Sequence, residues 1–363
     1  MAITAAMVKE LREMTGAGMM DCKKALNETN GDMDAAVEFL RKNGQAKAEK
    51  KASRIAAEGL CTVVVKDDTT AAVVEVNSET DFVAKNETFQ SFVKAVAAQA
   101  VNSDAKDMDA FMAEAWNEDA SKTVNDALVE KVAVIGENLK IRRFEKVVAE
   151  HGCVVSYVHG GGRIGVIVAG NGASDDAAKE ALKNVAMQIA AMNPQYISRA
   201  DISADAMAKL KEITVDSALN APDTLPKPIL NKLIAKAVDG VWSAEDVAIY
   251  EEKKSNMNFL FNFLSKEAKA QLAELAIADK DVIVADKIFN GLVEGRISKQ
   301  VKEISLLDQV YVKAEDGKQT VAKYLESVNK DLKIASFVRF EVGEGMEKKN
   351  EDFAAEVAKQ MNV

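Results

Sequence analysis

The residue types that support acid–base, nucleophilic or metal chemistry are scarce in this chain. Its 363 residues include two histidines, His151 and His159, and three cysteines, Cys22, Cys61 and Cys153. The cysteines are far apart and outside any CxxC spacing, so neither a disulfide framework nor a zinc site is indicated. We expect them to be buried as small apolar residues. With so few histidines, the sequence favours no catalytic residue, no metal, no cofactor and therefore no enzyme.

Three glycines match the spelling of a dinucleotide-binding turn but not its context. Gly160, Gly162 and Gly165 satisfy GxGxxG, a motif that must leave a strand and open a helix to hold a pyrophosphate. Here the glycines lead into a second β-branched run, which predicts a plain hairpin turn. The chain has no GxxxxGK[ST] sequence, so we do not expect it to be a P-loop GTPase itself.

One loop combines acidic and aromatic side chains between a strand and a helix. It consists of Thr80, Asp81, Phe82 and Val83. In the commoner arrangement Asp81 or Asn86 would cap the helix and Phe82 would pack into the core. The alternative is an exposed tip that wedges into a partner protein.

A second loop carries a histidine. His159 ends a β-branched run just before three glycines. A single histidine at a hairpin tip is most often a solvated turn residue. The glycine-rich setting would also let it project as an interface anchor, so both interpretations stay open.

The elements that position these loops occur twice in the same order. Residues 61–65 and 72–76 are β-branched runs followed by a helical pattern. The order returns at 152–158 and 164–168, with a helix at 175–192. We infer an internal duplication and an α+β fold, in which helices cover one face of each sheet.

The remaining segments are mostly helical in pattern. Residues 4–43 predict three short helices, and three prolines should divide a long helix-rich stretch after residue 200. The other expected elements are a helical region at 107–134, a returning strand at 138–148, strands at 309–313 and 334–342, and helices at 321–326 and 352–361.

Composition limits the class of partner. Hydrophobic residues make up 48% of the chain and charged residues 29%, and the net charge is −10. This charge disfavours direct nucleic-acid binding. No apolar run reaches the ~20 residues of a membrane span and no signal pattern opens the chain, so we expect no membrane association and a cytoplasmic location.

Five ordered motifs resemble the elongation factor Ts family. They are VKELREMTGAGMMDCKKAL at 8–26, EVNSETDFVA at 75–84, IGENLKIRR at 135–143, GRIGV at 162–166 and FEVGEG at 340–345. The resemblance extends along nearly the whole chain and is interrupted chiefly at 204–295, where it implies a shorter helical hairpin.

The resemblance implies a domain organisation. The expected parts are a three-helix, ubiquitin-associated-like docking domain (1–44), a connector helix (45–58), a first core subdomain (59–150), a second core subdomain (151–343) with a helical insertion at 204–295, and a C-terminal helical module (344–363).

The resemblance also implies a guanine nucleotide exchange factor for the translation GTPase elongation factor Tu. Thr80, Asp81, Phe82 and Val83 would approach the Mg²⁺ and nucleotide site of that GTPase, and His159 would enter one of its apolar pockets. The residues alone leave two rivals open: a protein-binding or chaperone-like module without exchange activity, and an RNA-binding translation protein.

Overall fold

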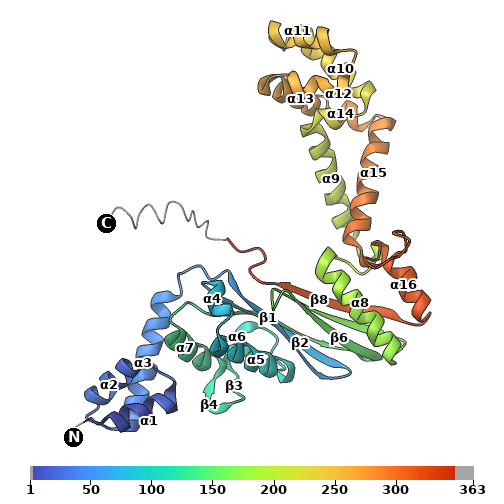
Figure 1. The fold of residues 1–363 in the computed structure, drawn as a ribbon. Coiled ribbons are helices and arrows are strands. Elements are labelled where there is room, and N and C mark those ends of the chain that lie inside the picture. The colour runs from blue at the N-terminus through green and yellow to red at the C-terminus, as the bar shows by residue number, and fades with distance from the viewer. Residues whose placement is uncertain (1–2, 348–363) are drawn as a thin grey trace. The chain divides into compact units, whose positions relative to one another are not determined.

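The computed structural model describes residues 3–347 of the protein (Figure 1). The chain divides into two compact units. Pro194–Val321 forms one, called here the helical unit, and the described residues on either side of it form the other, called the core unit. The helix expected at 352–361 lies outside the described residues, as does most of the segment 344–363.

The core unit begins with a three-helix bundle, as the helical pattern at 4–43 predicted. The helices are α1 (Ala5–Thr15), α2 (Met19–Glu28) and α3 (Met33–Lys51). The Thr4 hydroxyl caps α1, and Asp32 caps α3. Helix α3 continues unbroken to Lys51, so the segment expected as a connector begins inside this helix.

Two three-stranded antiparallel sheets follow, with orders β1-β2-β5 and β6-β7-β8. The first sheet consists of β1 (Glu58–Asp67), β2 (Thr70–Ser78) and β5 (Lys140–Val148), and the second of β6 (Gly152–His159), β7 (Ile164–Asn171) and β8 (Lys333–Glu341). Helix α5 (Glu87–Asn102) packs on β1 and β2, and α8 (Asp176–Met192) packs on β6 and β7. The repeated order of strands, helix and returning strand confirms the duplication and the α+β class.

The two sheets pack against each other because strand β2 is apolar on both faces. Ala72 and Val74 belong to the core under α5, whereas Ala71 and Val73 belong to a second core shared with Ile167 of β7. Alternate residues of a strand point to opposite faces, so one β-branched run supplies both cores.

A buried carboxylate also joins the two sheets. Glu75 of β2 is 0% exposed and accepts hydrogen bonds from Arg142 Nη1 (3.0 Å), Arg143 Nε (2.6 Å), Asn77 Nδ2 (3.0 Å) and the Gly343 amide just after β8 (2.8 Å). Four donors from both sheets therefore converge on one carboxylate.

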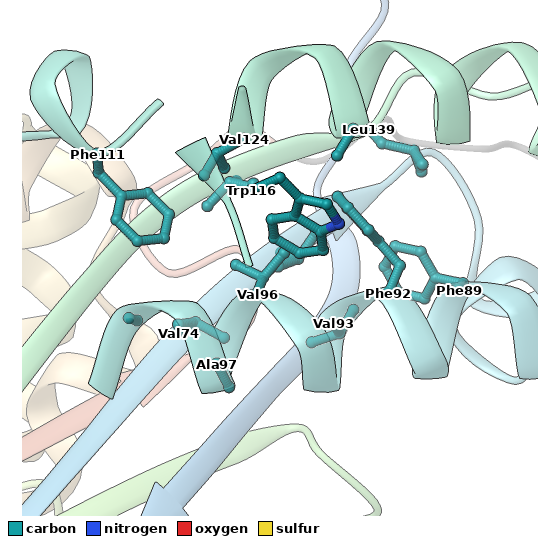
Figure 2. Close-up of a cluster of buried hydrophobic side chains, with 14 of the residues drawn as sticks. Val74, Phe89, Phe92, Val93, Val96, Ala97, Phe111, Trp116, Val124 and Leu139 are labelled. Atoms are coloured by element: carbon teal, nitrogen blue, oxygen red, sulfur yellow. The ribbon is translucent and has the colours of Figure 1, made fainter. Parts of the chain in front are cut away.

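The helical pattern at 107–134 is a partly wrong prediction. The region holds α6 (Met108–Ala113), a hairpin of β3 (Ala115–Trp116) and β4 (Asp119–Thr123), and α7 (Val124–Ile135). Buried Gln99 of α5 holds this hairpin: its side chain accepts from the Asn117 amide (2.9 Å) and donates to the Ala115 carbonyl (3.3 Å). Figure 2 shows that the hairpin inserts Trp116 among Phe92, Val96 and Val124.

The helical unit has its own core. Its helices are α9 (Ala204–Asn220), α10 (Lys227–Val238), α11 (Ala244–Lys253), α12 (Met257–Phe263), α13 (Lys266–Ala278), α14 (Lys280–Val284) and α15 (Lys287–Ile304), with short 3₁₀ turns at Arg199–Asp201, Pro222–Thr224 and Leu306–Asp308. The break between α9 and α10 falls at the prolines, as predicted. Buried Trp242 donates to the Ala268 carbonyl (3.1 Å).

Residues 309–313 do not form the expected strand. Val310 and Thr320 make one isolated antiparallel bridge, and Tyr311 N bonds to Gln319 O (2.8 Å). Residues 312–313 and 315–317 between these partners form turns and a bend, so no further strand residues are available to pair. The helix α16 (Val321–Val328) then leads to β8.

Candidate functional site

The loop that follows β2 presents Phe82 to solvent. Thr80 caps the four-residue helix α4 (Asp81–Ala84), with its hydroxyl accepting from Val83 N (3.4 Å). Val83 is 9% exposed and belongs to the core under α5, whereas Phe82 is 78% exposed. Packing of Phe82 into the core, the commoner arrangement considered from sequence, is therefore wrong.

The polar residues next to Phe82 have different roles: Asp81 and Lys85 form an ion pair, and Asn86 caps a helix. Asp81 does not cap a long helix: it pairs with Lys85 (2.8 Å), and the hydrogen bond from Lys85 holds the pKa of the Asp81 carboxyl below its ordinary value. Asn86 does cap α5, accepting from the Thr88 amide (2.9 Å). The Lys85 ammonium also lies 5.9 Å from the centre of the Phe82 ring. The tip is thus an exposed aromatic ring flanked by one surface ion pair.

The turn that carries His159 is a hairpin, as the glycine spacing predicted. His159 is exposed at the end of β6, and its Nδ1 lies 2.9 Å from the Tyr157 hydroxyl. Gly160, Gly161 and Gly162 all adopt positive φ, which glycine accepts more readily than any residue with a side chain. Exposure is what both interpretations of His159 require.

Both loops lie at the same end of strand β1. Glu58, the first residue of β1, pairs in register with Ser78 just before the Thr80 loop. The Glu58 carboxylate also contacts Arg163 Nη1 (3.3 Å) in the hairpin turn. The amide of Cys61 donates to the Gly162 carbonyl (2.7 Å), which fixes the turn against β1. The structure thus places the two predicted loops on one end of the core unit.

The cysteine thiols lie outside the two loops and are buried. All three cysteines are buried, as predicted, and burial raises the pKa of the Cys61 thiol to about 12. Among residues 3–347, no three His, Cys, Asp or Glu side chains group together as metal ligands. In the same part of the chain, no helix is both long and apolar enough to cross a membrane.

One residue of the site was missed by sequence reasoning. The Glu137 carboxylate accepts from the amides of Glu79 (3.0 Å) and Thr80 (3.1 Å) and from the Thr80 hydroxyl (2.7 Å). It lies 57 residues beyond Thr80. The sequence motif at 135–143 marked this segment but gave no sign of what it contacts.

Comparison with known proteins finds relatives that align with nearly the whole chain. A family model described as Elongation factor TS matches residues 79–344. The chain is 42% identical to Elongation factor Ts of Clostridium novyi (strain NT) and 43% identical to that of Clostridioides difficile (strain 630), in each case over 99% of both chains. It is 41% identical to that of Halothermothrix orenii over all of this chain and 99% of the relative.

These alignments run through the helical unit, so its length is not peculiar to this protein and the expectation of a shorter hairpin does not hold for these relatives. The family model alone covers well over half of the residues, including both loops. The chain belongs to the elongation factor Ts family.

Proposed function

We propose that this protein promotes the release of GDP from elongation factor Tu and so allows that GTPase to reload with GTP. The observation that carries the proposal is the exposure of Phe82 on a loop whose backbone is held by hydrogen bonds. Burial of this ring in a partner would contribute about 2 kcal/mol or more to binding.

The proposed mechanism uses binding energy rather than covalent chemistry. In a GTPase, Mg²⁺ bridges protein and phosphate oxygens, and displacing it leaves phosphate charge uncompensated. Insertion of Thr80, Asp81, Phe82 and Val83 beside that site would lower the affinity for GDP. Because coupling between sites is reciprocal, bound GDP weakens the binding of this chain by the same factor by which this chain weakens the binding of GDP, and rebinding of GTP then displaces the exchange factor. No bond is made or broken by this chain, so it is not an enzyme in the chemical sense.

Two other surfaces fit this role. His159, at the same end of the core unit, would anchor the hairpin turn in the GTPase. The N-terminal bundle exposes Met14, Met19 and Met20, and flexible methionine side chains suit a docking face. We assign this bundle to gripping the GTPase domain and leave the second subdomain and the helical unit for the other domains of the partner.

The RNA-binding alternative loses its main support. An RNA-binding surface would need clustered basic residues. Lys47 and Arg54 lie in the basic segment 47–54, yet Lys47 pairs with Asp21 (3.0 Å) and Arg54 with Glu79 (3.4 Å). These partners reduce the positive charge available to phosphates.

The test is the release rate of a fluorescent GDP analogue from elongation factor Tu, measured against increasing concentrations of this protein. We expect the wild type to accelerate release and Phe82→Ala to reduce the acceleration at least about ten-fold, because the variant loses the burial energy of the ring. His159→Ala should have a smaller effect, since less apolar area is lost.

Val148→Ala is the control, because Val148 of β5 is 55% exposed and pairs with Thr70, at the end of β2 opposite the Thr80 loop. It should leave the acceleration largely intact. If the wild type fails to accelerate release at any concentration, the protein is a binding module without exchange activity. Equal losses in the Phe82 and His159 variants would refute the ranking of the two loops.

A further inference from the structure

The direction in which Phe82 points is set by the backbone rather than by packing of its ring. The side chain is 78% exposed, and its ring lies 5.9 Å from the ammonium group of the exposed Lys85. Helix α4 has only four residues and is too short to be stable by itself. Other groups must therefore hold the start of this helix.

Glu137 supplies that support. One carboxylate oxygen accepts from the Glu79 and Thr80 amides, and the other accepts from the Thr80 hydroxyl. Thr80 is the N-cap residue of α4 and Glu79 precedes it. Their amides have no partner within the helix, so an external acceptor both satisfies them and fixes the entry of the chain. A carboxylate at this position also interacts favourably with the positive end of the helix.

A second carboxylate makes the arrangement reciprocal. Glu79 Oε1 accepts from the Asn138 amide (2.6 Å), while Glu137 accepts from the Glu79 amide. Asn138 Nδ2 then donates to the Arg54 carbonyl (2.8 Å), and Arg54 Nη1 lies 3.4 Å from Glu79. Three segments that are distant in sequence, at 54, 79–80 and 137–138, therefore close one hydrogen-bonded ring.

We propose that Glu137 is a positioning residue for exchange: it holds the Thr80 loop in the conformation that presents Phe82 to the GTPase. This inference rests on the proposed exchange function. Its physical basis is preorganisation, because a loop already fixed in its binding conformation loses less conformational freedom when it inserts. Glu137 itself need not touch the partner.

The first test concerns the free protein and does not depend on exchange activity. In Glu137→Gln the side chain keeps its size but loses its charge and one acceptor oxygen. We expect the Glu79 and Thr80 amides to exchange with deuterium at least about ten-fold faster than in the wild type, since they lose a charged acceptor. Glu145→Gln, which alters an exposed carboxylate of β5, is the matched control and should leave both amides protected.

The second test is a double-mutant cycle on GDP release. Glu137→Gln should lower the maximal release rate about ten-fold, with a smaller change in the concentration needed for half-maximal effect, because the other docking surfaces remain. In a Phe82→Ala background the same change should cause little further loss, since the ring to be positioned is gone. Glu137→Asp, which keeps the charge, should recover part of the rate.

The outcomes separate this inference from the proposed function. Unchanged amide protection in Glu137→Gln, or a loss that adds in full to that of Phe82→Ala, overturns the positioning role. A wild-type protein that does not accelerate release overturns the exchange function and this role with it, even if amide protection depends on Glu137. The unfolding midpoints of Glu137→Gln and Glu145→Gln should be similar, because the proposed role concerns one loop and not the stability of the whole fold.

Discussion

At the scale of single residues, the two carboxylates that organise the core unit both accept from backbone amides. Glu137 orders an exposed loop, whereas Glu75 is buried between the sheets. Burial alone would raise the pKa of Glu75, but hydrogen bonds from the Gly343 amide, Asn77 and the two arginines outweigh it and lower the pKa. Charged Glu75 is therefore the form that the fold stabilises.

Glu75→Gln should destabilise the core unit in a pH-dependent way. The lowered folded-state pKa means that Glu75 contributes stability above its unfolded pKa of about 4.3, and that this contribution is lost as pH falls through the folded value. We expect the variant to lose about 2 kcal/mol of unfolding free energy at pH 7, because Arg142 and Arg143 lose their charged partner.

Urea unfolding at a series of pH values checks this prediction, with Glu145→Gln as the control. The difference between Glu75→Gln and wild type should narrow below about pH 4. A difference that stays constant down to acid pH would show that shape and packing, not the charge of Glu75, hold the sheets together.

At the scale of elements, the sequence was most informative where a periodic pattern was long. The duplicated sheets and the three-helix bundle follow from such patterns, because one strand or helix face must meet a core. The hairpin at Trp116 did not follow from such a pattern, because it is held by Gln99, which lies in another helix. The sequence did not predict that Val83 rather than Phe82 would fill the core, nor that Thr80 would bond to Glu137, a residue distant in the chain.

The close approach of the two sheets depends on a small residue in β7. A Cβ added to Gly165 would lie 3.0 Å from Val73 Cγ2 and 3.3 Å from Cys61 Cβ, both on the first sheet. Gly165→Ala should therefore destabilise the core unit by about 1–3 kcal/mol, the usual cost of overpacking. The measurement is urea unfolding followed by fluorescence of Trp116, in a Trp242→Phe background.

Gly291→Ala is the matched control for Gly165→Ala. Gly291 lies on the exposed face of α15 with no atom within 4 Å of an added Cβ. Alanine there should be neutral or stabilising, by up to about 1 kcal/mol, because of its higher helix propensity, and Trp242 in a Trp116→Phe background reports the effect. If Gly165→Ala also left the unfolding free energy unchanged, the two sheets could move apart without a loss of stability.

At the scale of the whole molecule, the two compact units have separate hydrophobic cores. The cluster around Leu233, Leu260 and Phe289 lies wholly within the helical unit, and those around Val74 and Ile167 lie wholly within the core unit. The single tryptophans of the units, Trp116 and Trp242, are both buried and report on one core each. Separate cores predict separate folding.

Hydrogen bonds join the segment where the chain enters the helical unit to the end of α15 and the segment that follows it, and that segment to the exit. Gln195 and Tyr196 donate from the entering segment to the Ile304 carbonyl (2.9 and 3.1 Å), and Val321 donates to Gln309 O (3.0 Å) near the exit. Entry and exit therefore lie close enough for a short linker to replace everything between them. Cutting at the limits of the expected insertion, 204–295, would instead sever α15 inside the helix.

Replacing residues 194–320 by a short Gly-Ser linker should leave the core unit folded, because the clusters around Val74 and Ile167 lie entirely outside the replaced residues. We expect Trp116 emission typical of a buried indole and one cooperative unfolding transition within a few degrees of the transition that Trp116 reports in the full chain. The separate fragment 194–321 should also unfold cooperatively, reported by Trp242. Solvent-exposed Trp116 emission in the deletion variant, with no transition, would mean that the core unit requires the helical unit to fold, despite their separate cores.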